Sequence, residues 1–243
     1  MKTRNNIPYI IDYLTYRKCY KVEQYKKNSM KIETIKSKGF ALSIILFPLM
    51  LLTGFVMHPD LIEMKMLHTA QDLADRFHNN FLYHIGHFIV MMAVPLIIVV
   101  MVGTMNRLHG KGKKYAFWGG VIGIFGAFIL AVDKGALCLI MSAFDTIPEP
   151  QFQGFISYLD VIVKKAGLLW IVYFLPLLPL GAILQTIGLI KEKLLPKWQG
   201  VFIIVGLLLL NNPEIELIST FGSVLMCIGY LPWGIKEFRL SKI

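Results

Sequence analysis

Long apolar runs separated by short polar stretches dominate this chain. Six runs cover residues 39–57, 81–105, 115–144, 166–190, 198–210 and 217–235. A helix needs about 20 apolar residues to cross about 30 Å of hydrocarbon. Five runs approach or exceed that length, whereas residues 198–210 are short for a full crossing. The pattern predicts an all-α, polytopic membrane bundle of six transmembrane helices.

Two further stretches have apolar residues at helical spacing. They are residues 61–78, with Met66, Ala70, Leu73 and Phe77, and residues 152–163, with Phe152, Phe155, Ile156, Leu159 and Val163. One apolar side predicts helices that lie on the membrane surface or cap the bundle. The second stretch is also compatible with an outward extension of the fourth span.

Basic residues collect in every second connection. Ten Lys and Arg lie in residues 1–38, four in 106–114, three in 191–197 and three in the C-terminal tail. Because cytoplasmic loops carry an excess of Lys and Arg, both termini are expected in the cytoplasm. We therefore expect a basic cytoplasmic segment, residues 1–38, followed by a six-helix transmembrane domain, residues 39–243. Met30 is an alternative start, which would make residues 1–29 an optional extension.

Composition agrees with a membrane protein, since 56% of the residues are hydrophobic and the mean hydropathy is +0.60. The net charge of +10 comes from Lys and Arg between the apolar runs, and no nucleic-acid motif accompanies them. We therefore expect a lipid bilayer as partner and no nucleic acid. The three cysteines are far apart and form no C-x-x-C, which indicates neither a disulfide framework nor a thiolate metal site.

Five of the six histidines fall between residues 58 and 87, on the predicted outer side. His84 and His87 share one face of the second span, three residues apart. Asp133 of the third span, with Lys134 beside it, lies at about the same depth. Ionisable groups inside a span are costly and usually face a partner. We therefore expect His84 or His87 to pair with Asp133, whereas Asp145 is expected in a plain loop.

Other polar residues close the neighbouring spans at this level, and they predict an outward-facing polar pocket. The secondary residues of this pocket are Lys134, Asn211 and Glu216. One hypothesis is a divalent metal such as zinc, with His84, His87, His58 and Asp133 as candidate ligands. A histidine general base and a haem ligand are alternatives. The remaining alternative is structural, in which a His–Asp pair only joins two helices. No H-E-x-x-H motif is present.

Small residues form one face of the third span: Gly119, Gly120, Gly123 and Gly126. Such faces let helices approach closely in lipid, so we expect helix packing there. A membrane-protein partner or a homo-oligomer through the Gly119 and Gly123 face is the alternative.

Three segments carry a resemblance to known proteins, namely residues 87–135, 179–206 and 221–235. They resemble small uncharacterised bacterial multi-pass membrane proteins that have a histidine early in one span. That group also has an Asp-Gly-like break late in the next span and a proline before the fifth. Here Asp133-Lys134-Gly135 replaces a plain Asp-Gly. The resemblance implies the topology and an emphasis on His87 and Asp133, and no activity.

Three functional hypotheses follow from the sequence. The first is a non-catalytic accessory, sensor or immunity-type protein that acts through partner contacts. The second is a metal- or small-ligand-binding protein, or an enzyme, that uses the outer His and Asp cluster. The third is a small transporter, which prolines in several spans would allow but no inverted repeat supports. The absence of a catalytic motif favours a protein that is not an enzyme.

Overall fold

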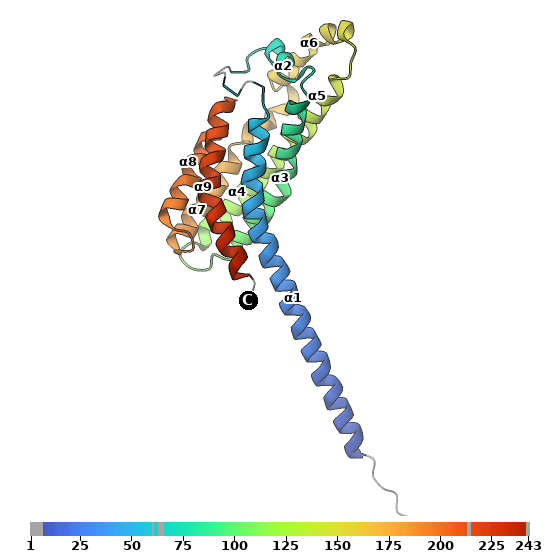
Figure 1. The fold of residues 1–243 in the computed structure, drawn as a ribbon, viewed down its shortest axis with the longest axis vertical. Coiled ribbons are helices and arrows are strands. Elements are labelled where there is room, and N and C mark those ends of the chain that lie inside the picture. The colour runs from blue at the N-terminus through green and yellow to red at the C-terminus, as the bar shows by residue number, and fades with distance from the viewer. Residues whose placement is uncertain (1–6, 60, 63–65, 213–214, 242–243) are drawn as a thin grey trace, which may run out of the picture.

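The computed structural model describes residues 7–59, 61–62, 66–212 and 215–241, with side chains from residue 30 onward. Every regular element within them is helical, which confirms the all-α part of the predicted fold class (Figure 1). Six helices make up the bundle: α1 (Ile7–Val56), α3 (Phe81–Met105), α4 (Lys113–Ala131), α7 (Leu177–Lys191), α8 (Lys197–Leu209) and α9 (Glu216–Leu240). Three shorter ones lie at one end: α2 (Ala70–Phe77), α5 (Cys138–Phe144) and α6 (Glu149–Val163).

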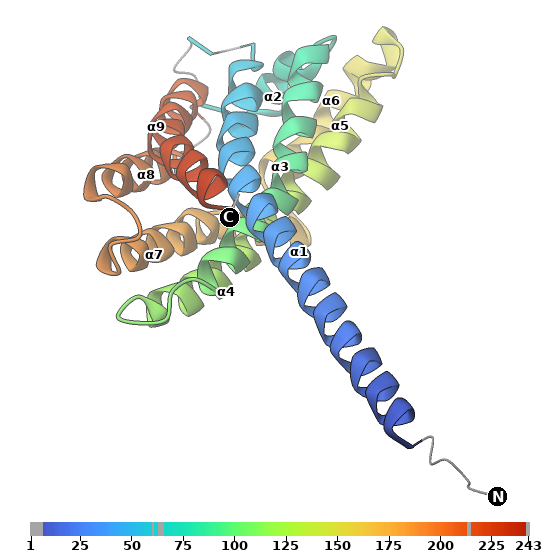
Figure 2. The ribbon, with the colours of Figure 1, turned by 60° about the horizontal axis from the view of Figure 1, so that its bottom comes forward.

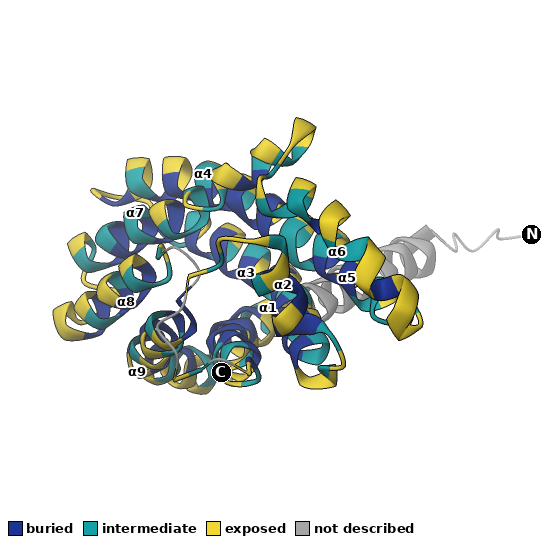
Figure 3. Cartoon of the chain, turned by 90° about the horizontal axis from the view of Figure 1, so that it is seen from above, coloured by how far each residue is buried: buried dark blue, intermediate teal, exposed yellow. Residues whose placement is uncertain are grey.

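The six bundle helices close into a ring. Going around it, α1 packs against α3, then α4, α7, α8 and α9 follow, and α9 returns to α1. Figure 3 shows this arrangement viewed from one end of the bundle. Ring closure matters for function because the inward sides of six helices surround a common interior.

Side-chain contacts identify the two ends of the ring. At one end Glu192, just after α7, accepts hydrogen bonds from the backbone of Gly110 and Gly112, and Glu237 of α9 lies 3.5 Å from Arg107. We call this the basic end. At the other end, the histidine end, His58 after α1 meets Glu216 at the start of α9. Helices that follow one another in the ring therefore alternate in direction.

Helix α1 continues far beyond the ring at the basic end. It runs without a break from Ile7 to Val56, so the expected boundary at residue 38 is not a break in the helix. Figures 1 and 2 show its N-terminal half projecting past the end of α9. The question of an optional extension over residues 1–29 falls partly on residues 1–6, which lie outside the described chain.

Within the described residues, five helical segments are long and apolar enough to cross a membrane: Met30–Val56, Phe81–Met105, Lys113–Phe144, Gly167–Lys191 and Glu216–Leu240. Helix α8 has 13 residues and a length of about 20 Å. That is less than the roughly 30 Å of a hydrocarbon core. The chain is thus a membrane-type helical protein with five segments of crossing length and one shorter apolar helix.

Two expected spans are not continuous α-helices. The third contains a π-helix, η1 (Val132–Leu137), between α4 and α5, and the fourth begins with a 3₁₀ helix, η2 (Gly167–Phe174), before α7. Pro176 and Pro179 lack the N–H groups that would carry an α-helix from η2 into α7, so the helix changes type and restarts at Leu177. Of the expected surface helix 61–78, the described residues 61–62 and 66–78 are helical over Ala70–Phe77, which begins with a capping box between Thr69 and Asp72.

The glycine face of α4 packs inside the chain. A Cβ atom added to Gly181 of α7 would lie 2.3 Å from the Gly123 nitrogen and 2.5 Å from the Gly119 oxygen. A Cβ atom added to Gly119 would likewise lie 2.6 Å from the Gly181 oxygen, so the two backbones can approach this closely only because Gly119 and Gly181 are glycine. The predicted helix packing is confirmed, and α7 covers the face that a second chain would need.

Candidate ligand-binding cavity

A cavity of about 670 Å³ lies inside the ring. All six ring helices line it, through Phe47 of α1, Val90 of α3, Leu130 of α4, Ala182 of α7, Leu207 of α8 and Met226 of α9, among others. Small-molecule sites usually measure about 300–1,000 Å³ and are mostly apolar with a few placed polar groups. This cavity has that size and that composition.

The cavity runs along most of the bundle. On α3 its lining extends from Tyr83 to Thr104, a distance of about 32 Å at 1.5 Å per residue. Trp233 and Leu189 line it near the basic end. Beyond them Arg107 lies 3.6 Å over the ring of Phe40, which in turn meets Trp233 edge-on. The basic end is therefore covered by a layer of packed aromatic and charged side chains.

Polar residues gather where the cavity reaches the histidine end: His58, Arg76, Tyr83, His87, Asp133, Lys134, Asn211, Asn212, Glu216 and Ser219. We call this set the polar head of the cavity. The sequence predicted the pocket and placed His58, His87, Asp133, Lys134, Asn211 and Glu216 in it. It did not predict Arg76 or Tyr83, because nothing in the sequence pattern says that α2 and the outer turn of α3 face the same space.

Two buried imidazoles lie side by side in the polar head. The ring centroids of His58 and His87 are 4.6 Å apart, and the Tyr83 ring lies 4.3 Å from His87. His87 donates from Nδ1 to the Tyr83 carbonyl oxygen at 2.9 Å. A neutral imidazole with a hydrogen on Nδ1 has an acceptor lone pair on Nε2. No described residue hydrogen-bonds to that Nε2, so His87 presents an acceptor at the polar head.

Glu216 links the first and last ring helices beside these rings. Its Oε1 lies 3.0 Å from Nδ1 of His58 and 3.9 Å from Nη1 of Arg76. The His58 contact has the distance of an ion pair, although the ring is not aligned for a straight hydrogen bond. A buried carboxylate is retained when charged partners surround it. Glu216 therefore places His58 and Arg76 at one point of the cavity.

Asp133 and Lys134 reach the cavity from the π-helix η1, and their side chains pair with each other at 3.0 Å. Single π-turns inside helices are frequent at functional sites because they turn side chains to new directions. The expected pairing of His84 or His87 with Asp133 is wrong. Asp133 pairs with Lys134, His84 pairs with Asp145, and His87 uses the Tyr83 carbonyl oxygen.

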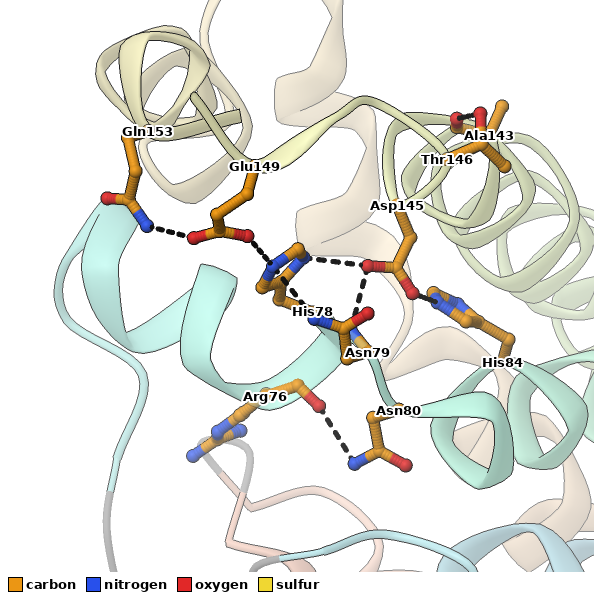
Figure 4. Close-up of polar contacts among 10 residues, drawn as sticks. All are labelled: Arg76, His78, Asn79, Asn80, His84, Ala143, Asp145, Thr146, Glu149 and Gln153. Carbon is orange, nitrogen blue, oxygen red and sulfur yellow. Dashed lines mark hydrogen bonds and ion pairs between the residues drawn. The ribbon is translucent and has the colours of Figure 1, made fainter. Parts of the chain in front are cut away.

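Asp145 joins the caps of the histidine end instead of lying in a plain loop. It accepts from the Asn79 backbone at 2.8 Å, from His78 at 2.9 Å and from His84 at 3.0 Å (Figure 4). His78 also contacts Glu149 and stacks on Phe152 of α6. These contacts, which we call the Asp145 clasp, hold the α2–α3 turn against the start of α6.

Hydrogen bonds within the Asp145 clasp favour the charged forms of Asp145 and His78. Partial burial alone would raise the pKa of Asp145, but hydrogen bonds from Asn79, His84 and His78 outweigh burial and lower it. Partial burial likewise opposes the charged form of His78, yet its bonds to Glu149 and Asp145 raise the pKa above the ordinary value. The clasp is thus a set of mutually stabilising charges, which sequence spacing could not reveal because its members come from separate turns.

The structure does not bring the four candidate metal ligands together. Among the described residues no three His, Cys, Asp or Glu side chains come together in a way that could hold a metal ion. His58 and His87 are adjacent, but His84 belongs to the clasp and Asp133 to its own ion pair. The histidines are better suited to hydrogen-bond a ligand than to enclose a metal.

Comparisons with known proteins give no relative. Neither a family model, nor a curated protein, nor a solved structure matches this chain. The resemblance to small bacterial membrane proteins stays a prediction, and the candidate function rests on the cavity and its polar head.

Proposed function

We propose that all six ring helices lie in a bacterial cytoplasmic membrane, with the histidine end outside and both termini in the cytoplasm. The alternation of helix direction around the ring supports this orientation. So does the charge pattern, because the connections at the basic end carry the excess of Lys and Arg. The bilayer is thinned beside α8, or α8 and its following turn cross together, since α8 alone is short.

We propose further that this is a ligand-binding membrane protein whose ligand is a small amphipathic molecule. The observation that carries the proposal is the 670 Å³ cavity, apolar along most of its length and polar at one end. Protein interiors are normally packed with few voids larger than a water molecule. A bundle that served only to hold partners would have no use for such a space.

The surface beside η2 supports entry from the membrane. Tyr173 is well exposed and also lines the cavity, so the cavity reaches the surface next to this 3₁₀ helix. Leu168 and Trp170 of η2 are exposed as well and would face lipid at this level. An amphipathic molecule dissolved in the outer leaflet would meet the opening directly.

Two adjacent residues of α3 allow a matched test. Val100 lines the cavity and is buried, whereas Val99 is exposed on the lipid side. Purified wild type in nanodiscs should bind an environment-sensitive amphipathic dye, and Val100→Trp should lose most of that binding because the indole fills the cavity. Val99→Trp should bind like wild type. Equal binding by all three proteins, or none by wild type, would refute the proposed function.

A further inference from the structure

The cavity is elongated. Its lining follows α3 for about 32 Å, and its volume of about 670 Å³ lies within the usual range of small-molecule sites. A long site with polar residues at one end fits an extended amphiphile whose head lies at that end.

The lining divides into two parts that match an amphiphile of this kind. Between the polar head and Trp233, mostly aliphatic and aromatic side chains such as Leu51, Ile97 and Met226 line the walls. Gln185 and Thr186 also line this part, and both donate hydrogen bonds to backbone carbonyl oxygens. At the polar head, Nε2 of His87 is an acceptor without a protein partner in the described chain, and His58 lies 4.6 Å away. An acceptor of this kind suits a head group that carries an O–H hydrogen.

We infer that the ligand is an amphiphile with a hydroxyl or carboxyl head, of the class of long-chain alcohols and fatty acids. Its head hydrogen-bonds to His87 beside His58, and its chain extends along α3 toward Trp233. This assignment rests on the proposed function, and it adds the orientation of the ligand and the chemistry of its head.

Chain length provides the first measurement. Fatty acids and fatty alcohols of increasing length are used to displace the dye from the full-length protein in nanodiscs, with the free aqueous monomer held constant by an albumin carrier. Burial of one methylene contributes about 0.8 kcal/mol, so affinity for the monomer should rise about fourfold per added methylene. The rise should stop when the chain reaches the layer at Trp233.

Filling the lower cavity should move that limit. Ala182 lines the cavity on α7, and Leu180 of the same helix is exposed on the outside. Ala182→Phe should stop the rise at a shorter chain, and Ala182→Leu should do so by a smaller amount, which covers the case in which the larger side chain prevents folding. Leu180→Phe should keep the wild-type limit.

The outcomes separate this inference from the proposed function. Failure of wild type to bind the dye would overturn the proposed function itself. Dye binding without any dependence of displacement on chain length, or with the same limit in Ala182→Phe, Ala182→Leu and wild type, would overturn the assigned orientation alone. Acids and alcohols that bind no better than the methyl esters of the same chains would overturn the role given to the head hydrogen.

Discussion

Replacing Asp145 with asparagine tests whether the clasp holds the histidine end together. The carboxylate is largely buried and accepts three hydrogen bonds, from the Asn79 backbone, His78 and His84. A hydrogen bond to a charged group contributes about 1.5–3 kcal/mol. Asparagine keeps the shape and part of the acceptor capacity, and water reaches the edge of the clasp. We therefore expect Asp145→Asn to lower the free energy of unfolding by about 2–3 kcal/mol, or the melting temperature by about 5–10 °C.

The effect should depend on pH in a defined direction. The pKa of Asp145 is lowered, so its contribution is present above the ordinary carboxyl value near 4 and is lost as the pH falls through the lowered value. The pKa of His78 is raised, so its contribution is present below the ordinary imidazole value near 6.5 and is lost as the pH rises through the raised value. The difference between wild type and Asp145→Asn should be largest between about pH 4 and 6.5.

The assay is thermal unfolding of the detergent-solubilised protein, followed across this pH range. Asp160 offers a matched control, because it is partly exposed on α6 and forms an i, i+4 ion pair with Lys164. Surface pairs of that kind contribute about 0–1 kcal/mol, so Asp160→Asn should have a small effect. Equal effects of the two substitutions, or an Asp145→Asn effect that grows above neutral pH, would refute the reasoning.

Three further outcomes are expected. Single cysteines at Lys111 and Gln151, in a background without native cysteines, should react with an impermeant reagent from opposite sides of the membrane, and labelling from one side would contradict the orientation. Gly181→Ala should destabilise the protein by about 1–3 kcal/mol or more, since its Cβ meets backbone of α4. Gly154→Ala, with open space around it, should be neutral, and similar melting temperatures would argue against the close α4–α7 contact. Wild type should show no specific zinc site at neutral pH, whereas binding of one equivalent would restore the metal hypothesis.

Hydrophobic patterning was sufficient to predict most of the helices. The second span was expected at residues 81–105, where α3 lies, and the fifth and sixth expected runs agree with α8 and α9 to within a few residues at each end. Patterning did not predict the interruptions at η1 and η2, because the Asp133-Lys134 pair and the prolines stand inside long apolar runs that are compatible with continuous helices. The restart of the helix after η2 has a local cause in Pro176.

The candidate site was predictable only in part. The position of each residue along its span predicted that His58, His87 and Glu216 lie at one depth in the membrane. The structure places all three at the polar head. Depth says nothing about rotation around the helix axis or about which helices are neighbours. His84 therefore turns to Asp145 instead of Asp133. Ring closure by α9 against α1, which creates the cavity, depends on packing between opposite ends of the chain.

Native mass spectrometry of the protein released from its own membrane shows directly whether the ring holds an amphipathic ligand. Wild type and the lipid-facing variant Val99→Trp should each carry one tightly held, non-covalent molecule of lipid-like mass. Val100→Trp should be free of it, because the indole occupies the same space. Wild type without a bound molecule, or the same bound mass in all three proteins, would contradict the claim.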